Sequence, residues 1–484
     1  MMRGMTETPA AAGPVRMHWP YCAVFLLLSL LVLIERVHAA DDPAARAQAP
    51  EPVIKALLPA VPAVPRKAQG LAVRDANLKE GAAFWKGGGW GDKLDPSERL
   101  DLEAEAAGEG KIWLPIALIE VPSGDPWVKM CLVDYGRYQR DPHTTPMYES
   151  LLSRSSCSVR GSGGNKAKLQ VLRLSSVLAQ IGPEGEGGSI APSGWIFHET
   201  RCGSTLVSNM LASLPTSRVF SESRPPVQVI RACDGVCDSQ TLSKVFKGVL
   251  QIMGRKRQGE EHLHMFFKFQ NSRFAPLITS VYPQVPWVYI FRDPVEVMVS
   301  NLKGAMGAPC LRVKRLQKAE HGPPQRRRQL HYRADRVVNA KNINLKRKKL
   351  GKARRSRVTD KMCQDCASLL KALCDTALEA HKLHPDTGML VDYTNLPDAL
   401  PEFIFPDHFG LAAEVQERCP TWKALMMDAS QAYSKGRASR PFTNDTEAKH
   451  ASAQPSIINA SAELYDVYHE LSRLQKWTKC AKPP

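Results

Sequence analysis

Outside one segment, the sequence carries almost no net charge. The chain has 484 residues and a formal net charge of +17, from 65 Lys or Arg and 48 Asp or Glu. Between Lys303 and Lys361 stand twenty basic and three acidic residues, and this excess of seventeen equals the whole net charge. A generally basic surface is therefore excluded. An anionic partner is expected only where this one segment can reach it.

The sequence also lacks an apolar run long enough for an ordinary membrane span. Trp19–Ile34 has sixteen residues, whereas about 20 are needed to cross a bilayer. We favour an uncleaved signal anchor in residues 1–40, followed by a Pro/Ala-rich stem in residues 41–70, as in a single-pass type II protein of the Golgi membrane. Two alternatives stay open: cleavage after Ala39, which would give a secreted protein, and a buried core helix.

Complete metal-binding patterns are missing as well. Cys363 and Cys366 form one C-x-x-C without a second pair, and His262 and His264 form an H-x-H without a third ligand. We therefore predict no metal. Export would permit disulfides among most of the twelve cysteines, but the sequence does not fix their pairing. Glycosylation sequons at Asn444 and Asn459 are consistent with export.

Residues 71–190 contain no repeat and no catalytic signature. They combine Gly-rich turns, an acidic helix-like stretch and a strand-like run from Ile112 to Val121. We interpret them as an accessory α+β region that precedes the main domain.

From residue 191 to about 480, short apolar runs alternate with amphipathic helical patterns. Helical patterns follow the first and fourth runs and extend between Cys363 and His381. This alternation predicts an α/β fold, a P-loop-like parallel β-sheet flanked by helices, with ligands at the carboxyl ends of the strands. The predicted strands are Gly194–His198, Ser217–Ser221, His264–Phe269, Trp287–Phe291 and Met389–Tyr393.

The first strand leads into the segment HETRCGSTL, which begins at His198 and opens a helix. A turn at Gly203 would expose backbone N–H groups at the positive end of the helix dipole, and Arg201 would add a cation. The segment lacks the Lys that ATPases and GTPases require, because Ser204 stands in its place. It therefore predicts an anion-binding loop of another class. The alternative is an ordinary strand-to-helix turn.

A second anion-binding element follows the fourth strand. That strand ends at Arg292-Asp293-Pro294, where Pro294 can begin a helix, and Ser300 lies about two turns into it. Arg292 and Ser300 could grip one phosphate from two sides. Two such elements indicate a ligand with two phosphate groups.

Three segments resemble the sulfotransferases. RCGSTLVSNMLASLP is similar to their 5′-phosphosulfate loop, and WVYIFRDPVEVMVSNLK to their 3′-phosphate element about ninety residues later. MLVDYTNLPDALPEFIFPDHFGL resembles a later strand-Tyr-Leu segment. Within this family, the segments most resemble those of the membrane-bound Golgi enzymes, including tyrosylprotein sulfotransferases. The resemblance covers 194–303 and 389–411.

The resemblance implies 3′-phosphoadenosine 5′-phosphosulfate (PAPS) as the sulfuryl donor, used without a metal. Arg201 would stabilise the bridging oxygen of the departing nucleotide. A Lys/Arg-Gly loop over the 3′-phosphate would correspond to Lys435 and Arg437, for which a solvated basic turn is the alternative. The implied donor-binding residues are Arg201, Cys202, Gly203, Ser204, Thr205, Arg292, Ser300, Lys435 and Arg437.

A catalytic base is expected near the phosphosulfate loop, because the acceptor hydroxyl loses a proton as its oxygen attacks sulfur. Glu222 follows the second strand, where Golgi-type members of the family carry a catalytic Glu. The alternative is a surface carboxylate paired with Arg224. Lys268 would contact the transferring group, unless it extends out of the sheet into solvent.

The basic segment, residues 305–360, is the sharpest departure from the family. It has few apolar residues and cannot supply a core, so a disordered insertion is the first expectation. The alternatives are a docking strip for a polyanionic glycan or acidic peptide, and a nucleic-acid-binding arm. We expect no nucleic acid as partner, because an exported chain would rarely meet one.

These observations predict a PAPS-dependent sulfotransferase that acts on a hydroxyl of a carbohydrate or protein (tyrosine) acceptor in the secretory pathway. Two rival functions remain. A P-loop small-molecule kinase would share the sheet and loop but should carry the missing Lys. A non-catalytic polyanion-binding protein on the same scaffold would need only the basic segment.

Overall fold

The computed structural model describes residues 97, 99–106, 110–155, 169–181, 188–257, 260–269, 272–303, 308–311, 358–432 and 444–476. All of them belong to one compact unit, Gly70–Pro484. The predicted signal anchor and stem, most of the basic insertion, Lys435 and Arg437 lie outside the described residues. Among the described helices, none combines the length and the apolar character that a bilayer crossing requires.

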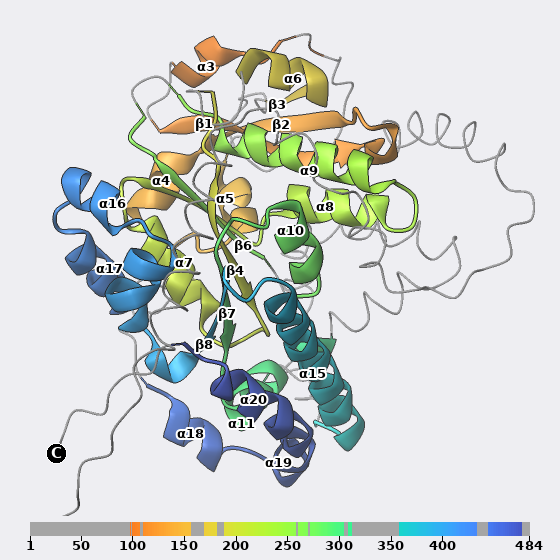
Figure 1. Cartoon of the computed structure of the whole chain (residues 1–484), viewed down its shortest axis with the longest axis vertical. Helices are drawn as coiled ribbons and strands as arrows, with labels where there is room; N and C mark the ends of the chain where they lie inside the picture. Colours follow the sequence, from red (N-terminus) through yellow and green to blue (C-terminus); the bar gives the residue numbers. More distant parts are fainter. Residues whose placement is uncertain are drawn as a thin grey trace, which may run out of the picture. The chain divides into compact units, whose positions relative to one another are not determined.

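The centre of the unit is a five-stranded parallel sheet with the order β5-β6-β4-β7-β8 (Figure 1). This confirms the predicted α/β class and parallel sheet, and each predicted strand agrees with an observed one to within two residues at either end. The strands are β4 (Pro192–His198), β5 (Ser217–Ser221), β6 (His264–Lys268), β7 (Trp287–Phe291) and β8 (Gly388–Asp392).

Helices cover both faces of this sheet, so nearly all residues of its strands are buried. α7 (Ser204–Ala212) and α17 (Trp422–Ser430) lie on one side, and α10 (Ala275–Val281) and α15 (Asp360–Leu383) lie on the other (Figure 1). All five residues of β7 are buried. The three helices that the sequence predicts are α7, α11 (Pro294–Leu302) and α15.

The strand order creates a switch point at the central strand β4. The chain leaves β4 towards β5 on one side, returns through β6, and then crosses to β7 and β8 on the other side. The connections after β4 and β7 therefore diverge, and a crevice forms between the carboxyl ends of these neighbouring strands. Both predicted anion-binding elements begin at this crevice.

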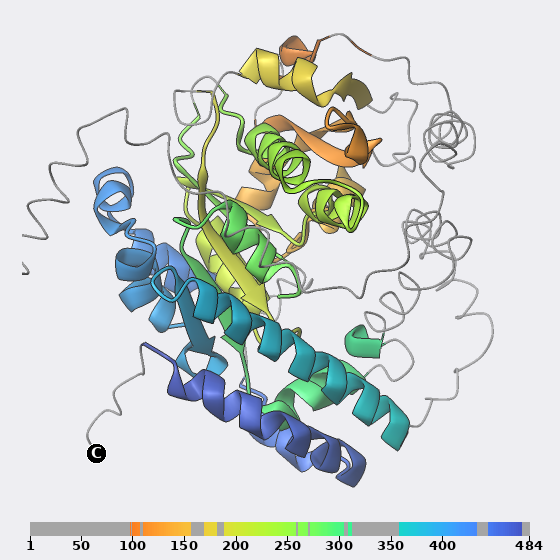
Figure 2. The same ribbon diagram turned by 45° about the vertical axis from the view of Figure 1, so that its right-hand side comes forward.

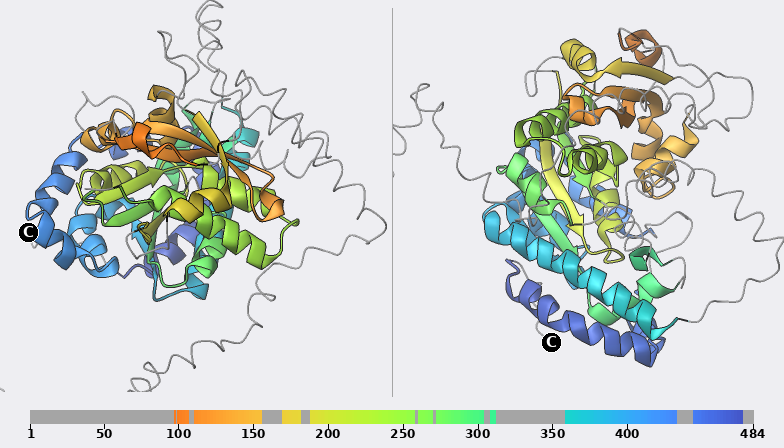
Figure 3. Two further views of the ribbon diagram at one scale, coloured as in Figure 1. Left: turned by 90° about the horizontal axis from the view of Figure 1, so that it is seen from above. Right: turned by 90° about the vertical axis from the view of Figure 1, so that its right-hand side faces the viewer.

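The described residues 99–106, 110–155 and 169–181 form a three-stranded antiparallel sheet with short helices. The order is β1-β2-β3, and α8 (Arg224–Cys233) and α9 (Ser239–Gly254) pack against β1 (Figure 3). The sequence indicated only the first of these strands. The elements are α3 (Leu102–Ala106), β1 (Lys111–Ile119), η3 (Val121–Ser123), β2 (Trp127–Asp134), α4 (Tyr135–Arg140), α5 (Tyr148–Arg154), β3 (Leu169–Arg173) and α6 (Leu174–Ile181).

Polar side chains fasten this small sheet to the main domain. The amide of Gln228, on α8, donates to the carbonyl of Leu118 at 2.7 Å and accepts from its N–H at 3.0 Å, as a neighbouring strand would. The hydroxyl of Tyr135 accepts from Val219 N at 2.6 Å and donates to Val219 O at 3.2 Å. The accessory region is thus joined to β5, the edge strand that β6 separates from β4.

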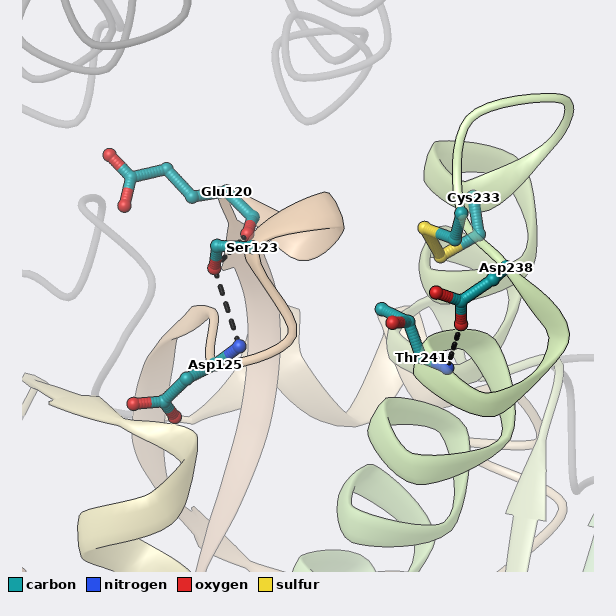
Figure 4. The surroundings of a disulfide bond; sticks show 7 residues. Glu120, Ser123, Asp125, Cys233, Asp238 and Thr241 are labelled. Carbon is teal, nitrogen blue, oxygen red and sulfur yellow. Dashed lines mark hydrogen bonds between the residues drawn. A yellow bond between two sulfur atoms is a disulfide. The ribbon is translucent and has the colours of Figure 1, made fainter. Parts of the chain in front are cut away.

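The turn between α8 and α9 is closed by a disulfide between Cys233 and Cys237 (Figure 4). Gly235 takes a positive φ of 68° within it, a conformation that suits glycine. Asp238 then caps α9 by accepting the N–H of Thr241 at 2.6 Å (Figure 4).

The C-terminal helices pack around α11 and α15. Figure 2 shows α15 running beside α19 and α20. The packed helices are α18 (Thr446–Ala451), α19 (Pro455–Ser461), η8 (Ala462–Leu464) and α20 (Tyr465–Arg473). η6 (Tyr393–Asn395), the π-helix η7 (Leu400–His408) and α16 (Ala412–Arg418) precede them in the chain.

A second disulfide, between Cys310 and Cys366, joins the segment after α11 to the first half of α15. The two cysteines are 56 positions apart in sequence, and nearly all of the basic insertion lies between them. The two ends of the insertion are thereby held together at the core, whatever path the rest of it takes.

Replacing Cys310 and Cys366 together with alanine should lower the free energy of unfolding by about 4 kcal/mol, because the bond restricts a long loop of the unfolded chain. The matched control is Cys233→Ala with Cys237→Ala. That bond closes only four positions, so its removal should cost about 2 kcal/mol. Guanidinium unfolding of both variants checks the order, and equal losses would contradict it.

Candidate active site

The loop between β4 and α7 has an unusual backbone. Thr200, Arg201 and Gly203 have φ values of 88°, 60° and 95°. Positive φ is costly for residues with a side chain, and such outliers concentrate at functional sites. Here they turn the chain through the start of α7 at Ser204, where helix N–H groups have no partner within the helix. The loop therefore has the form expected of an anion-binding turn.

Tyr393 packs directly against this loop. A Cβ atom on Gly203 would lie 2.4 Å from two carbons of the Tyr393 ring, so only glycine fits there. The same ring carries the guanidinium of Arg292 at 3.9 Å from its centroid. Tyr393 thus links the loop after β4 with the end of β7. The sequence placed it in a family-like segment but gave it no role.

Three predicted residues meet beside the loop. The ammonium of Lys268, at the end of β6, is 3.0 Å from Glu222 Oε1 and 3.2 Å from Thr205 Oγ1 on α7. The side chain of Lys268 is completely buried. The alternative in which Lys268 extends into solvent is therefore wrong.

Glu222 stands immediately after β5 in a left-handed conformation, with a φ of 57°. Its N–H donates to the carbonyl of Lys268 at 2.7 Å, and its side chain keeps 24% of its surface exposed. Arg224 pairs instead with Glu149 of α5, at 2.6 Å. The alternative, in which Glu222 pairs with Arg224, therefore differs from the structure, where Glu222 pairs with Lys268. Glu222 faces Lys268 and stays accessible from outside.

His198 joins the cluster and was not predicted. Its Nδ1 accepts the N–H of Thr200 at 3.1 Å, so a neutral ring carries its proton on Nε2. That Nε2 lies 3.9 Å from Glu222 Oε1. The available signal was its position as the last residue of β4, directly before the loop.

The accessory region contributes Met147 to the same place. Its Sδ is 3.7 Å from Lys268 Nζ and 3.5 Å from the Ser221 hydroxyl. Nearby, His143 contacts Asn209 of α7 at 3.1 Å, and burial lowers the pKa of this histidine. No sequence pattern marked Met147, because the contact depends on how residues 141–149 fold over β5 and α7.

Arg201 and Ser300 meet across the crevice. Nε of Arg201 donates to Oγ of Ser300 at 3.0 Å, which joins the loop after β4 to the helix after β7. The sequence assigned these residues to two different phosphate sites, and the structure places them in direct contact. Cys202, between Arg201 and Gly203, is completely buried with a free thiol.

Arg292 lies in a buried network of charges. Its guanidinium pairs with Glu296 and reaches Asp445 at 3.3 Å, while Lys449 lies 2.6 Å from the same Asp445. Burial would raise the pKa of Asp445, but the hydrogen bonds and charges of Lys449 and Arg292 prevail and lower it. Within the described chain, Nε of Arg292 has no hydrogen-bond partner. A shared grip of Arg292 and Ser300 on one phosphate stays a prediction.

Among the described residues, one group has oxygen and nitrogen atoms close enough to suggest a cation site: Asp293, Glu296 and His450. Glu296 already pairs with Arg292, and Asp293 pairs with His450 at 3.3 Å. These contacts account for the group as part of the charge network around Arg292. His262 and His264 lie at the start of β6, the end away from Lys268.

No protein-family model matches the sequence, and no curated protein is found to be similar to it. Two solved structures show a distant similarity to this chain. A sulfotransferase from Alicyclobacillus acidocaldarius is 11% identical, covers 58% of this chain and 96% of its own, and gives a TM-score of 0.24. Sulfotransferase STF9 from Mycobacterium avium is 9% identical, covers 84% and 98%, and gives a TM-score of 0.31. At these values the function has to be argued from the site.

Proposed function

We propose that the chain is a sulfotransferase that moves a sulfuryl group from PAPS to a hydroxyl of an acceptor. The observation that carries the proposal is the cluster of Glu222, Lys268 and Thr205 at the mouth of the left-handed loop. It combines a partly exposed carboxylate with a buried cation and the amino end of a helix. Such a site can accept a proton on one side and bind a transferring anionic group on the other.

The surroundings of the loop fit a donor with two separate phosphate groups. Arg201 lies in the loop after β4, and Ser300 and Arg292 follow β7; Arg201 contacts Ser300, and the ring of Tyr393 lies between Gly203 and Arg292. Arg292 is 6% exposed, and its Nε can still donate one hydrogen bond. The 5′-phosphosulfate would be held by Arg201 and residues 203–205, and the 3′-phosphate by Arg292.

In the proposed reaction the acceptor oxygen forms a bond to sulfur while the bond from sulfur to the 5′-phosphate oxygen breaks. Glu222 takes the proton of the acceptor hydroxyl. Lys268 and Thr205 donate towards the transferring oxygens, and Arg201 stabilises the charge on the departing phosphate. His198 Nε2 lies 3.9 Å from the same carboxylate.

The proposal includes an enzyme of the Golgi membrane, anchored by residues 1–40, with release into the secretory pathway as the alternative. Its support in the described chain is the pair of disulfides, Cys233–Cys237 and Cys310–Cys366, which form and persist in oxidising compartments. Both sequon asparagines, Asn444 and Asn459, are exposed. The acceptor is proposed to be a carbohydrate or a tyrosine-containing protein, with the basic insertion as a docking strip if that acceptor is polyanionic.

Nucleotide choice tests this function. Adenosine 3′,5′-bisphosphate should bind to the purified lumenal part without magnesium, and at least about tenfold more tightly than ADP or ATP, because one charge-assisted contact is worth about that factor. Isothermal titration calorimetry measures the three affinities. Arg201→Ala should weaken binding of the bisphosphate, whereas Arg173→Ala, far along the sequence on β3, should not. Equal affinity for ATP, or a need for magnesium, would favour the kinase instead.

A further inference from the structure

A buried carboxyl group connects the two elements of the candidate site. Glu199 follows the last residue of β4 and is 4% exposed. Its Oε1 accepts the backbone N–H of Arg292, the first residue after β7, at 2.7 Å. The hydrogen bond therefore spans the crevice beneath the loop, at the point where the two strands diverge.

The other carboxyl oxygen faces a chain of polar groups. The thiol of Cys374, on α15, lies 3.6 Å from Oε2 of Glu199, and the hydroxyl of Tyr289, on β7, donates to that sulfur at 3.3 Å. Within the described part of the chain, no cation forms an ion pair with Glu199. Both oxygens are thus occupied by groups without a formal charge.

The charged groups around Glu199 act on it in opposite directions. Burial raises its pKa to about 8, although the N–H of Arg292 and the thiol of Cys374 oppose the increase. The charge of Asp392 raises this pKa as well, and the guanidinium of Arg292 lowers it. Burial also raises the pKa of Cys374 and of Tyr289. All three groups are therefore neutral at pH 7.

We propose that Glu199 is a positioning residue, which fixes the amide of Arg292 against the phosphate loop and so sets the distance between the two anion-binding elements. The inference rests on the proposed function and deepens it. A neutral carboxyl group can hold this amide without placing a negative charge beside the phosphates of the ligand. Ionisation would add that charge and oppose binding, so binding is linked to the neutral form.

The first measurement is the affinity for adenosine 3′,5′-bisphosphate between pH 7 and pH 9. If only the neutral form binds, about a tenth of the molecules are competent one pH unit above a pKa of about 8, so the apparent Kd should rise about tenfold by pH 9. Glu199→Gln keeps an acceptor for Arg292 N–H and a donor towards Cys374, but it cannot ionise. Its affinity at pH 7 should equal that of the wild type, and the rise at pH 9 should disappear.

Glu199→Leu removes the hydrogen bond between the two anion-binding elements and leaves the N–H of Arg292 without its acceptor. Its affinity at pH 7 should fall by about 5- to 100-fold, the loss expected when a buried donor is orphaned. The matched control is Glu105, another carboxyl group that is 4% exposed and that accepts a backbone N–H, from Trp113 at 2.7 Å. Glu105→Leu should reduce stability without changing nucleotide affinity.

A ligand-free readout separates this inference from the proposed function. Hydrogen exchange of the peptide that ends at Arg292 should be faster in Glu199→Leu than in Glu199→Gln or Glu105→Leu. If the wild type binds no bisphosphate at any pH, the proposed function fails, and exchange alone decides the role of Glu199. Unchanged exchange, or the same pH dependence in Glu199→Gln as in the wild type, would overturn the inference. Should Glu199→Leu not fold, the Glu199→Gln profile still decides.

Discussion

Replacing Glu222 with glutamine should reduce turnover by about 10²- to 10⁴-fold, the usual contribution of a general base, while affinity for adenosine 3′,5′-bisphosphate changes by less than about threefold. The amide preserves the shape of the side chain and can still contact Lys268, but it cannot take the acceptor's proton. The measurement is release of the bisphosphate from PAPS with any acceptor that the wild-type enzyme sulfates, together with calorimetry of nucleotide binding.

The matched control for Glu222 is Glu149→Gln. Glu149 is also a partly exposed carboxylate, and it pairs with Arg224, the first residue of α8, at 2.6 Å. Turnover of the Glu149→Gln variant should stay within about twofold of that of the wild type, because an exposed ion pair contributes little energy. If Glu222→Gln remained fully active with every accepted substrate, the base would have to be a group other than Glu222.

The strands of the main sheet could be predicted because their residues are buried on both faces. WVYIF is an apolar run with clear boundaries, and SRVFS has an apolar centre at Val219 and Phe220; the observed strands Ser217–Ser221 and Trp287–Phe291 have the predicted ends. In contrast, β2 was missed. Lys129 interrupts its run of apolar residues, and its place as the central strand depends on pairing with β1 and β3 from both sides.

Which residues lie at the ligand edge could be predicted from the sequence, but their contacts with residues of distant elements could not. The end of a parallel strand marks Glu222 and Lys268 as residues near the ligand edge, and these two do meet. Their partners come from other elements. Met147, Tyr393 and Asp445 reach the site through long-range packing, which leaves no mark in local sequence.

The charge network of Arg292 shows the same limit in physical terms. Glu296, one turn after Arg292, could be seen in the sequence as an i, i+4 partner, but Asp445 is 153 positions away. The sequence predicted Arg292 as a phosphate ligand, and in the structure its guanidinium pairs with Glu296 and Asp445. Any phosphate that binds there must therefore share Arg292 with Glu296 or displace the exposed Asp445.

Substituting Gly203 with alanine should weaken binding of adenosine 3′,5′-bisphosphate by about 30- to 5,000-fold. Two costs combine: a left-handed conformation for a residue with a side chain, about 1–2 kcal/mol, and overlap of the new Cβ with Tyr393, about 1–3 kcal/mol. Gly235→Ala is the matched control, because its φ is also positive but nothing lies within 4 Å of the added atom. It should lose about 1 kcal/mol of stability and no affinity.

In the double variant with Tyr393→Ala, the overlap disappears while the backbone cost remains, so part of the affinity should return. If Gly203→Ala bound the nucleotide like the wild type, the loop after β4 would not be the anion site.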